Sequence, residues 1–185
     1  MTLVSTAAKA AASSGALTQL FTSTLGANTA SIDTGAGGIA AGFSVLEAWM
    51  VLRTTEAAVN SSARITVNND SGANYDRQTI SGSGVTAAAG NALAAAFWQV
   101  QVAGATATAG EVGIVVLTIP FYAATTFRKQ GSVLNMENDD AAAANQQANA
   151  LAVQWRNTAA ITRLAVTAGS GVLLAGSSLV IYGRT

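Results

Sequence analysis

The side chains that could carry chemistry in this chain are carboxylates, arginines, lysines and hydroxyls, because histidine and cysteine are both absent. A general base that works near neutral pH is most often histidine. A thiolate nucleophile requires cysteine, and zinc or copper sites draw most of their ligands from these two residue types. Nine carboxylates and nine cationic side chains remain. They leave open a paired-carboxylate glycosidase, a Ser-Lys hydrolase and an oxygen-ligated calcium site.

The run from Asn68 to Asp76 holds the densest group of oxygen donors. Asp70, Asn74 and Asp76 offer hard oxygens to calcium, but their spacing departs from the Asp-x-Asn-x-Asn-Gly order of a helix-loop-helix site. Asx side chains also bond to nearby backbone amides, and Gly72 permits a positive φ. We expect a tight structural turn here, with calcium near Asp70 and Asp76 as the less favoured alternative.

The other acidic residues form no recognisable catalytic pair. Asp139 and Asp140 are adjacent, so their side chains diverge. The glutamates without a catalytic frame around them are Glu47, Glu56 and Glu111. No glycine run completes the dinucleotide-binding fingerprint. We therefore expect a protein that is not an enzyme and has no cofactor.

The tryptophans invite a sugar-binding hypothesis, because an indole face packs well against a pyranose ring. Trp49 lies within an apolar run, and Trp155 precedes the run that carries Ile161. Both positions favour the core or a subunit interface. Phe97 and Trp98 are neighbours, so in a strand they point to opposite faces and one of them is expected to face another subunit.

Length and charge narrow the class of protein. A chain of 185 residues fits one domain with a sizeable core. Nine cationic and nine anionic residues give formal neutrality, which predicts no nucleic-acid partner. The apolar stretch Val112–Ala124 is too short to span a bilayer as a helix and contains Pro120, and Met1–Gly15 lacks the order of a secretory signal. We expect a soluble domain with no membrane partner.

The large apolar side chains fall in short runs separated by Gly, Ser, Asn and Thr, which is typical of strands and turns. The 41 alanines contribute little to packing. The predicted strands are Leu17–Leu25, Thr29–Thr34, Phe43–Arg53, Ala63–Asn68, Phe97–Ala103, Val112–Ile119, Ala160–Thr167 and Ser177–Gly183. This pattern predicts an all-β protein, an antiparallel β-sandwich (jelly roll) of about eight strands over residues 17–185, with an N-terminal arm over residues 1–16.

Alternation within the predicted strands indicates which residues form the core. Leu164 and Val166 share one face of their strand. The run 113–119 is apolar on both faces, as expected for a central strand covered by a second layer or by a neighbouring subunit. The predicted core residues are Trp49, Ile114, Val116, Trp155, Ile161 and Leu164.

Two segments do not show a strand pattern. Asp139–Val153 is rich in Ala, Gln and Asn and has high helix propensity, so a short helix and a loop both fit. Val85–Ala96 could form one or two helical turns near its end, but the glycines within and before it favour a loop.

Several short motifs occur in order along the chain. They are the Arg53–Thr54 step, the Asn-Asp-Ser-Gly-x-Asn-Tyr turn at 69–75, Pro-x-Tyr-Ala at 120–123, Trp-x-x-Thr-x-Ala-Ile at 155–161, Ala-Gly-Ser at 175–177 and Tyr-Gly at 182–183. With these motifs the chain resembles a jelly-roll module found in virion proteins of tailed bacteriophages. The resemblance covers most of the chain beyond the first fifteen residues, although the Ala-rich segment 139–152 departs from it.

The resemblance implies a capsid decoration, tail-fibre or tail-tip component that forms a homotrimer without catalytic activity. The chain is a single short module with no fibrous repeat and little charge. We therefore expect a capsid decoration (cement) protein on the capsid exterior that bridges subunits of the major capsid protein. The interface residues expected for it are Leu3, Val4, Phe97, Trp98 and Tyr122, and the arm is expected to order on the shell or to exchange between protomers.

The alternative is a tail-fibre or tail-tip adhesin that binds a host surface glycan. It would use the loops Asn69–Tyr75 and Asn135–Gln147, and it requires Trp98 or Tyr122 to be exposed for stacking on a sugar. A carbohydrate-active enzyme is a third possibility, and it would require a carboxylate pair that the sequence does not show.

Overall fold

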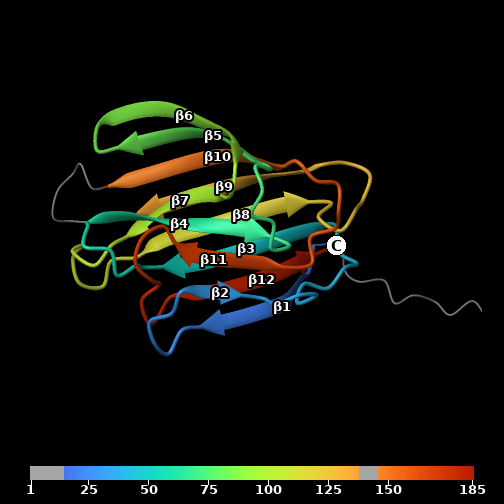
Figure 1. Cartoon of the computed structure of the whole chain (residues 1–185), viewed down its shortest axis with the longest axis horizontal. Helices are drawn as coiled ribbons and strands as arrows, with labels where there is room; N and C mark the ends of the chain where they lie inside the picture. Colours follow the sequence, from blue (N-terminus) through green and yellow to red (C-terminus); the bar gives the residue numbers. More distant parts are fainter. Residues whose placement is uncertain (1–14, 138–145) are drawn as a thin grey trace, which may run out of the picture.

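The fold is an antiparallel β-sandwich with one sheet twice as wide as the other (Figure 1). This computed structural model describes residues 15–137 and 146–185, and those residues form twelve strands and no helix. The strands are β1 (Leu17–Thr24), β2 (Ser31–Asp33), β3 (Val45–Leu52), β4 (Asn60–Val67), β5 (Tyr75–Ser83), β6 (Thr86–Ala95), β7 (Trp98–Ala103), β8 (Gly113–Pro120), β9 (Lys129–Glu137), β10 (Gln147–Trp155), β11 (Leu164–Ala168) and β12 (Ser178–Arg184).

The large sheet has the strand order β1-β12-β3-β8-β9-β10-β5-β6, and the small sheet has the order β2-β11-β4-β7. All neighbouring strands pair antiparallel. The predicted antiparallel sandwich is therefore confirmed, with twelve strands instead of about eight. The strands that the sequence did not indicate are β5, β6, β9 and β10, which form one contiguous end of the large sheet.

The core lies between the two sheets and is built by strict alternation in the central strands. In β3, Leu46, Ala48, Met50 and Leu52 are buried while the residues between them are exposed or half-buried. The predicted core residues Trp155, Ile161 and Leu164 are buried, and the last of these pairs with Val67 in the small sheet.

Three predicted core residues lie on the other face of the large sheet. Trp49 is 47% exposed and Ile114 is 42% exposed, and Val116 is half-buried. The prediction was wrong for these residues because the small sheet covers only one face of β3 and β8. The residues of β8 that enter the core are those of the opposite parity, including Val115 and Leu117.

The small sheet ends at β7 and leaves the far end of the large sheet without a covering layer. Strand β7 packs on β8 and β9 and reaches β5, but nothing in the described structure lies over β6. Every residue of β6 is exposed or half-buried. The strands β10, β5 and β6 therefore form an overhang, visible at the top of Figure 1.

The two ambiguous segments become strands of this overhang. Val85–Ala96 contains the turn and second strand of the β5–β6 hairpin, in which Gly84 has a φ of 55°, so the expected loop is wrong. The predicted helix 139–153 is wrong from Gln147 onward, because β10 pairs with β9 on one side and with β5 on the other. Its first part lies outside the described residues, as does most of the predicted arm 1–16.

The described ranges contain no helix long and apolar enough to cross a membrane.

Candidate functional site

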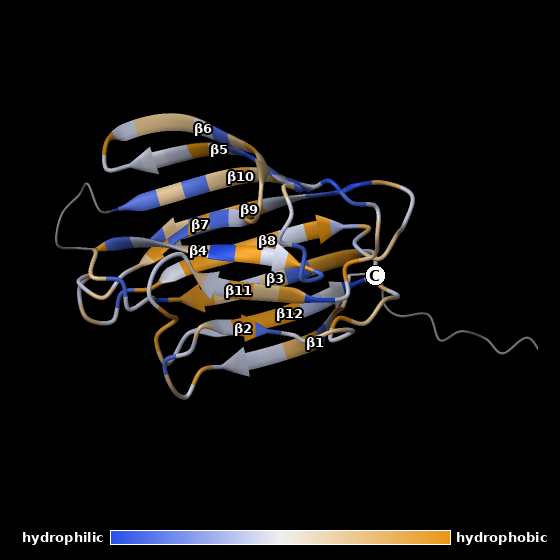
Figure 2. Cartoon of the chain, viewed as in Figure 1, coloured by the Kyte–Doolittle hydropathy of each residue, from blue (hydrophilic) through white to orange (hydrophobic). Residues whose placement is uncertain are grey.

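The candidate site is the outer face of the large sheet, which means the face turned away from the small sheet. The exposed large hydrophobic residues that project from this face include Trp49, Val51, Ile80, Ile114, Leu134 and Met136. Figure 2 shows hydrophobic residues concentrated in the central strands β3, β8 and β12, and more hydrophilic residues in β9 and β10.

Strand register arranges these side chains in rows that cross the sheet. One row runs through Val180, Trp49, Val116, Leu134, Ala150, Ile80 and Ala89 on seven successive strands. The next row runs through Ser178, Val51, Ile114, Met136, Ala148, Gly82 and Ala87. Neighbouring strands lie about 4.8 Å apart and same-face residues about 7 Å apart, so the two rows make a continuous apolar surface about 30 Å wide.

Charge is almost absent from these rows and from the one beside them. The third row contains Glu47, whose carboxylate lies 3.0 Å from the guanidinium of Arg184. Tyr182 flanks Glu47 and meets Trp49 edge-to-face, with ring centroids 5.7 Å apart. The two apolar rows cover roughly 400 Å², which is the size of the largest apolar patch on a typical soluble monomer, and such patches are often functional. This surface is therefore the part of the molecule best suited to contact another protein.

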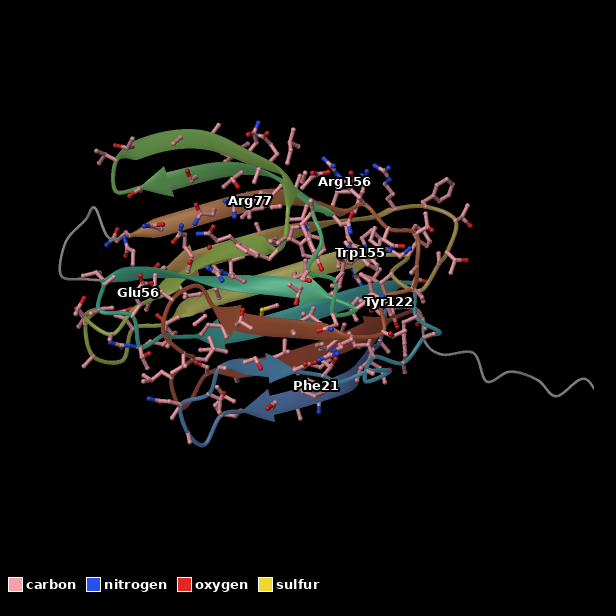
Figure 3. The ribbon with its side chains drawn as sticks, in the orientation of Figure 1. Phe21, Glu56, Arg77, Tyr122, Trp155 and Arg156 are labelled. Carbon is pink, nitrogen blue, oxygen red and sulfur yellow. The ribbon has the colours of Figure 1, made fainter. Side chains whose placement is uncertain are left out.

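A second feature is a polar cleft of about 290 Å³ on the opposite face of the overhang, where no strand covers the large sheet. Its lining includes the β5 side chains Arg77, Thr79 and Ser81, together with Gln147 and Asn149 of β10. Figure 3 labels Arg77 on this side of the molecule. Burial lowers the pKa of the Arg77 guanidinium, whose Nη1 donates to the Gln99 carbonyl at 3.0 Å.

The free edge of β7 borders this cleft and is capped by side chains of the large sheet. The Asn135 side chain accepts from the Gln101 N–H at 2.8 Å and donates to the Gln101 carbonyl at 2.7 Å. Asn149 in turn donates to Asn135 Oδ1 at 3.3 Å. An edge whose hydrogen-bonding groups are already engaged is protected from pairing with another strand. The cleft therefore offers a ligand mainly neutral amides and hydroxyls, with the Arg77 guanidinium as the charged group of its lining.

The predicted turn at 68–76 forms, and the Asp70 carboxylate is its centre. Asp70 Oδ1 accepts from the Gly72 N–H at 2.8 Å, and Oδ2 accepts from Asn74 Nδ2 at 2.9 Å and from the buried indole of Trp155 at 2.7 Å. Positive φ values occur at Asn68 (51°) and Asn69 (57°) and not at Gly72, so that part of the prediction was wrong. A Cβ at Gly72 would lie 3.0 Å from Asn74 Nδ2 and 3.1 Å from Asp70 Oδ1, so a larger residue would require these two side chains to shift slightly.

Asp76 is engaged separately, in a salt bridge of 2.7 Å with Arg156. The hydrogen bond from Arg156 holds the pKa of Asp76 below its usual value, against the effect of burial. Figure 3 shows Arg156 and Trp155 at the same end of the sandwich. The carboxylate oxygens of Asp70 and Asp76 thus accept from N–H donors. In the described part of the chain, no three His, Cys, Asp or Glu residues are grouped as metal ligands would be.

The predicted interface aromatics do not reach the surface as expected. Trp98 is buried and meets Tyr75 edge-to-face with centroids 5.2 Å apart, and Tyr122 is buried with its hydroxyl donating to the Ala40 carbonyl. Phe97 is half-buried beneath the guanidinium of Arg64, which lies 4.7 Å from the ring centroid. The exposed platform that the adhesin hypothesis required is therefore not formed by Trp98 or Tyr122. Leu3 and Val4 lie outside the described residues.

The residues that sequence reasoning missed as surface candidates are Val51, Leu134 and Met136. The run of apolar residues on both parities in β8 was the signal that could have found them, because it left open a neighbouring subunit as the cover of one face. Comparisons of this chain with models of known protein families, with curated proteins and with solved structures find no match.

Proposed function

We propose that this chain is a non-enzymatic structural protein of a bacteriophage virion, which decorates the capsid exterior and stabilises the head by bridging subunits of the major capsid protein. The observation that carries this proposal is the apolar, nearly uncharged outer face of the large sheet. The ordered motifs from Arg53–Thr54 to Tyr182–Gly183 and the resemblance that they support point to the virion.

Such a protein acts through buried area and requires no reacting group. Burial of apolar surface contributes about 25 cal/mol per Å², and a stable interface removes about 800 Å² from each partner. Association costs reduce the net gain for each contact, but the contact is repeated around the shell. The Trp49 and Leu134 side chains, 47% and 55% exposed, are the large apolar groups that such a contact would bury near the middle of the face.

The proposal is tested by sedimenting purified protein with expanded, undecorated capsids. We expect the wild-type chain to pellet with the particles and to raise the temperature at which the shells open. Leu134→Arg places a charge on the outer face and should lose this stabilisation. Ser170→Arg, in the exposed turn after β11, is the matched control and should retain it. Wild-type protein that remains in the supernatant would overturn the proposal.

The polar cleft favours a second candidate function, the binding of a host glycan by a tail component. Thr79, Ser81, Gln147 and Asn149 present neutral donors and acceptors of the kind that bind sugar hydroxyls. Fluorescently labelled protein should then stain host cells, and Asn149→Ala should weaken the staining while Ser170→Ala should not. Protein that binds capsids but leaves host cells unstained would remove this candidate.

A further inference from the structure

The apolar outer face divides into two halves of different shape. One half, which we call the ridge, carries large side chains on β3, β8 and β9: Trp49, Val51, Ile114, Val116, Leu134 and Met136. The other half, the shelf, carries small residues on β10, β5 and β6: Ala148, Ala150, Ala152, Gly82, Ala87 and Ala89. Larger residues also stand among the shelf rows: Ile80 in the row of Ala150, and Gln78 and Asn91 in the row of Ala152.

Solvent exposure does not account for the shelf. Alanine is depleted in strands, where β-branched, aromatic and hydroxyl residues are preferred at exposed positions. The alanines of β10 are exposed, yet the cleft side of the same strand carries Gln147 and Asn149, which are the residues that solvent favours. A row of small residues beside a row of large ones is instead the pattern by which facing layers interdigitate.

We propose that, in the chain free of capsids, the occupant of the outer face is a second copy of this chain, packed face to face about a two-fold axis that runs along β9. A rotation of 180° about that axis sets β8 over β10 and β3 over β5 of the partner, whereas β9 meets its own copy. Ile114 and Val116 on β8 then lie over Ala148 and Ala150 on β10. A contact of this kind is isologous and closed, as in most homodimers.

Area and charge support this occupant. Three rows over seven strands cover about 30 Å by about 20 Å, or roughly 600 Å² in projection, and a corrugated surface has more accessible area than its projection. A stable interface buries about 800 Å² for each partner, which is of the same order as the area of this face. The charged group within the three rows, Glu47, is paired with Arg184, so the approach of two identical faces brings no unpaired charges together.

This inference rests on the proposed function only for the role of the dimer in the virion. The same face carries the proposed contact with the shell, so the two-fold dimer is the form of the chain free of capsids, in which a second copy covers that face until capsid subunits replace it. The sequence resemblance implies a homotrimer, whereas a self-complementary face favours a dimer. The experiment is carried out on purified protein without capsids, so its outcome is independent of the capsid-binding test.

Sedimentation velocity of the full chain measures the first consequence. We expect a dimer at micromolar concentration for the wild-type chain. Leu134→Arg sets two like charges against each other at the axis and should raise the dissociation constant about 30-fold or more, the factor that corresponds to a hot-spot loss of about 2 kcal/mol. Ser170→Arg should leave the dimer intact. A monomer or a trimer for the wild-type chain would overturn the proposal.

A crosslinking experiment tests the position of the two-fold axis. Because the chain has no cysteine, a maleimide reacts only at the cysteine that is introduced. Ser132 is exposed on the outer face of β9, so on this axis it lies opposite its own copy. A short bis-maleimide should couple Ser132→Cys protomers into covalent dimers and should leave Ser170→Cys uncoupled at the same concentration. Unfolding temperatures equal to that of the wild-type chain establish that both variants fold. A dimer that fails to couple through position 132 would show that another surface mediates association.

Discussion

Replacement of Asp70 by alanine tests whether the turn at 68–76 anchors the sandwich through Trp155. The carboxylate accepts three hydrogen bonds, from Gly72, Asn74 and Trp155, at 2.8, 2.9 and 2.7 Å. Trp155 is 1% exposed, so Asp70→Ala leaves its indole N–H without this acceptor in a buried site. Hydrogen bonds to a charged group contribute about 1.5–3 kcal/mol, and the two turn bonds add less because they are partly solvated. We expect a loss of about 3 kcal/mol in the free energy of unfolding.

Urea unfolding at pH 7, followed by tryptophan fluorescence, measures this loss. With an m-value of about 2 kcal/mol/M, the midpoint should fall by about 1.5 M for Asp70→Ala. Arg184→Gln is the control, because it breaks an ion pair in which the Arg184 side chain is 42% exposed, and such pairs contribute little. Its midpoint should move by less than about 0.3 M. Equal shifts for the two variants would refute the reasoning.

A double-mutant cycle isolates the bond between the two side chains. Trp155→Phe keeps an aromatic ring in the core and removes the donor, so Asp70→Ala should cost less in that background than in the wild-type chain. We expect a coupling free energy of about 1.5 kcal/mol or more between the two positions. Strict additivity would show that Asp70 acts through the backbone of the turn alone.

The same carboxylate sets a pH dependence with a defined sign. Burial of Asp70 acts to raise its pKa, but the hydrogen bonds from Trp155, Gly72 and Asn74 outweigh burial and lower the pKa below the usual value of 3.8. The unfolded chain therefore binds the proton more readily, and the stabilisation is present above about pH 4 and is lost as the pH falls through the lower folded pKa. Asp70→Asn should make the decline of unfolding free energy below pH 4 shallower. An unchanged decline would contradict this assignment.

Three substitutions test the packing elsewhere. A Cβ at Gly113 would lie 2.6 Å from the Val102 Cα in the facing sheet, so Gly113→Ala should lower the free energy of unfolding in urea by about 1–3 kcal/mol. Gly90→Ala is the control, because a Cβ there would have nothing within 4 Å, and it should change this free energy by less than about 0.5 kcal/mol. Equal effects would contradict the close approach of the sheets. The buried Lys129 ammonium donates to three backbone carbonyls, so Lys129→Met should cost about 2–4 kcal/mol, seen as a lower unfolding temperature. An unchanged temperature would show that these carbonyls find other donors.

The sequence predicted the strands of the small sheet and four strands of the large sheet opposite it, and it missed β9 and the three strands of the overhang. The eight predicted strands correspond to β1, β2, β3, β4, β7, β8, β11 and β12, which lie in the small sheet or opposite it. Apolar and polar residues alternate clearly in several of these strands, because one face of each packs on the core. In the part of β10 beyond the small sheet, the polar Asn149 faces the cleft and the apolar Ala150 faces outward, which reverses the usual pattern of a core strand. The composition of this segment resembles that of a helix. Its pairing with β9 and β5 makes it a strand.

The candidate site was only partly predictable for a related reason. Parity within β3 places Trp49 opposite the core residues on either side of it, but an apolar run alone does not reveal which parity is covered. The local sequence around Phe97 and Trp98 predicted that the two aromatics face opposite ways. The structure buries Trp98 and leaves Phe97 stacked with Arg64, so the neighbour of Phe97 belongs to the same chain.

The two uncovered surfaces of the large sheet differ in a way that bears on function. On the cleft side, Thr79, Ser81 and Asn149 are polar where no layer covers them, as solvent exposure requires. On the outer side, Trp49 and Leu134 are 47% and 55% exposed in the isolated chain and are apolar. Because both surfaces belong to one sheet, differences in strand propensity do not explain the contrast. Solvent accounts for the first surface, and the contact that we propose with another protein surface would account for the second.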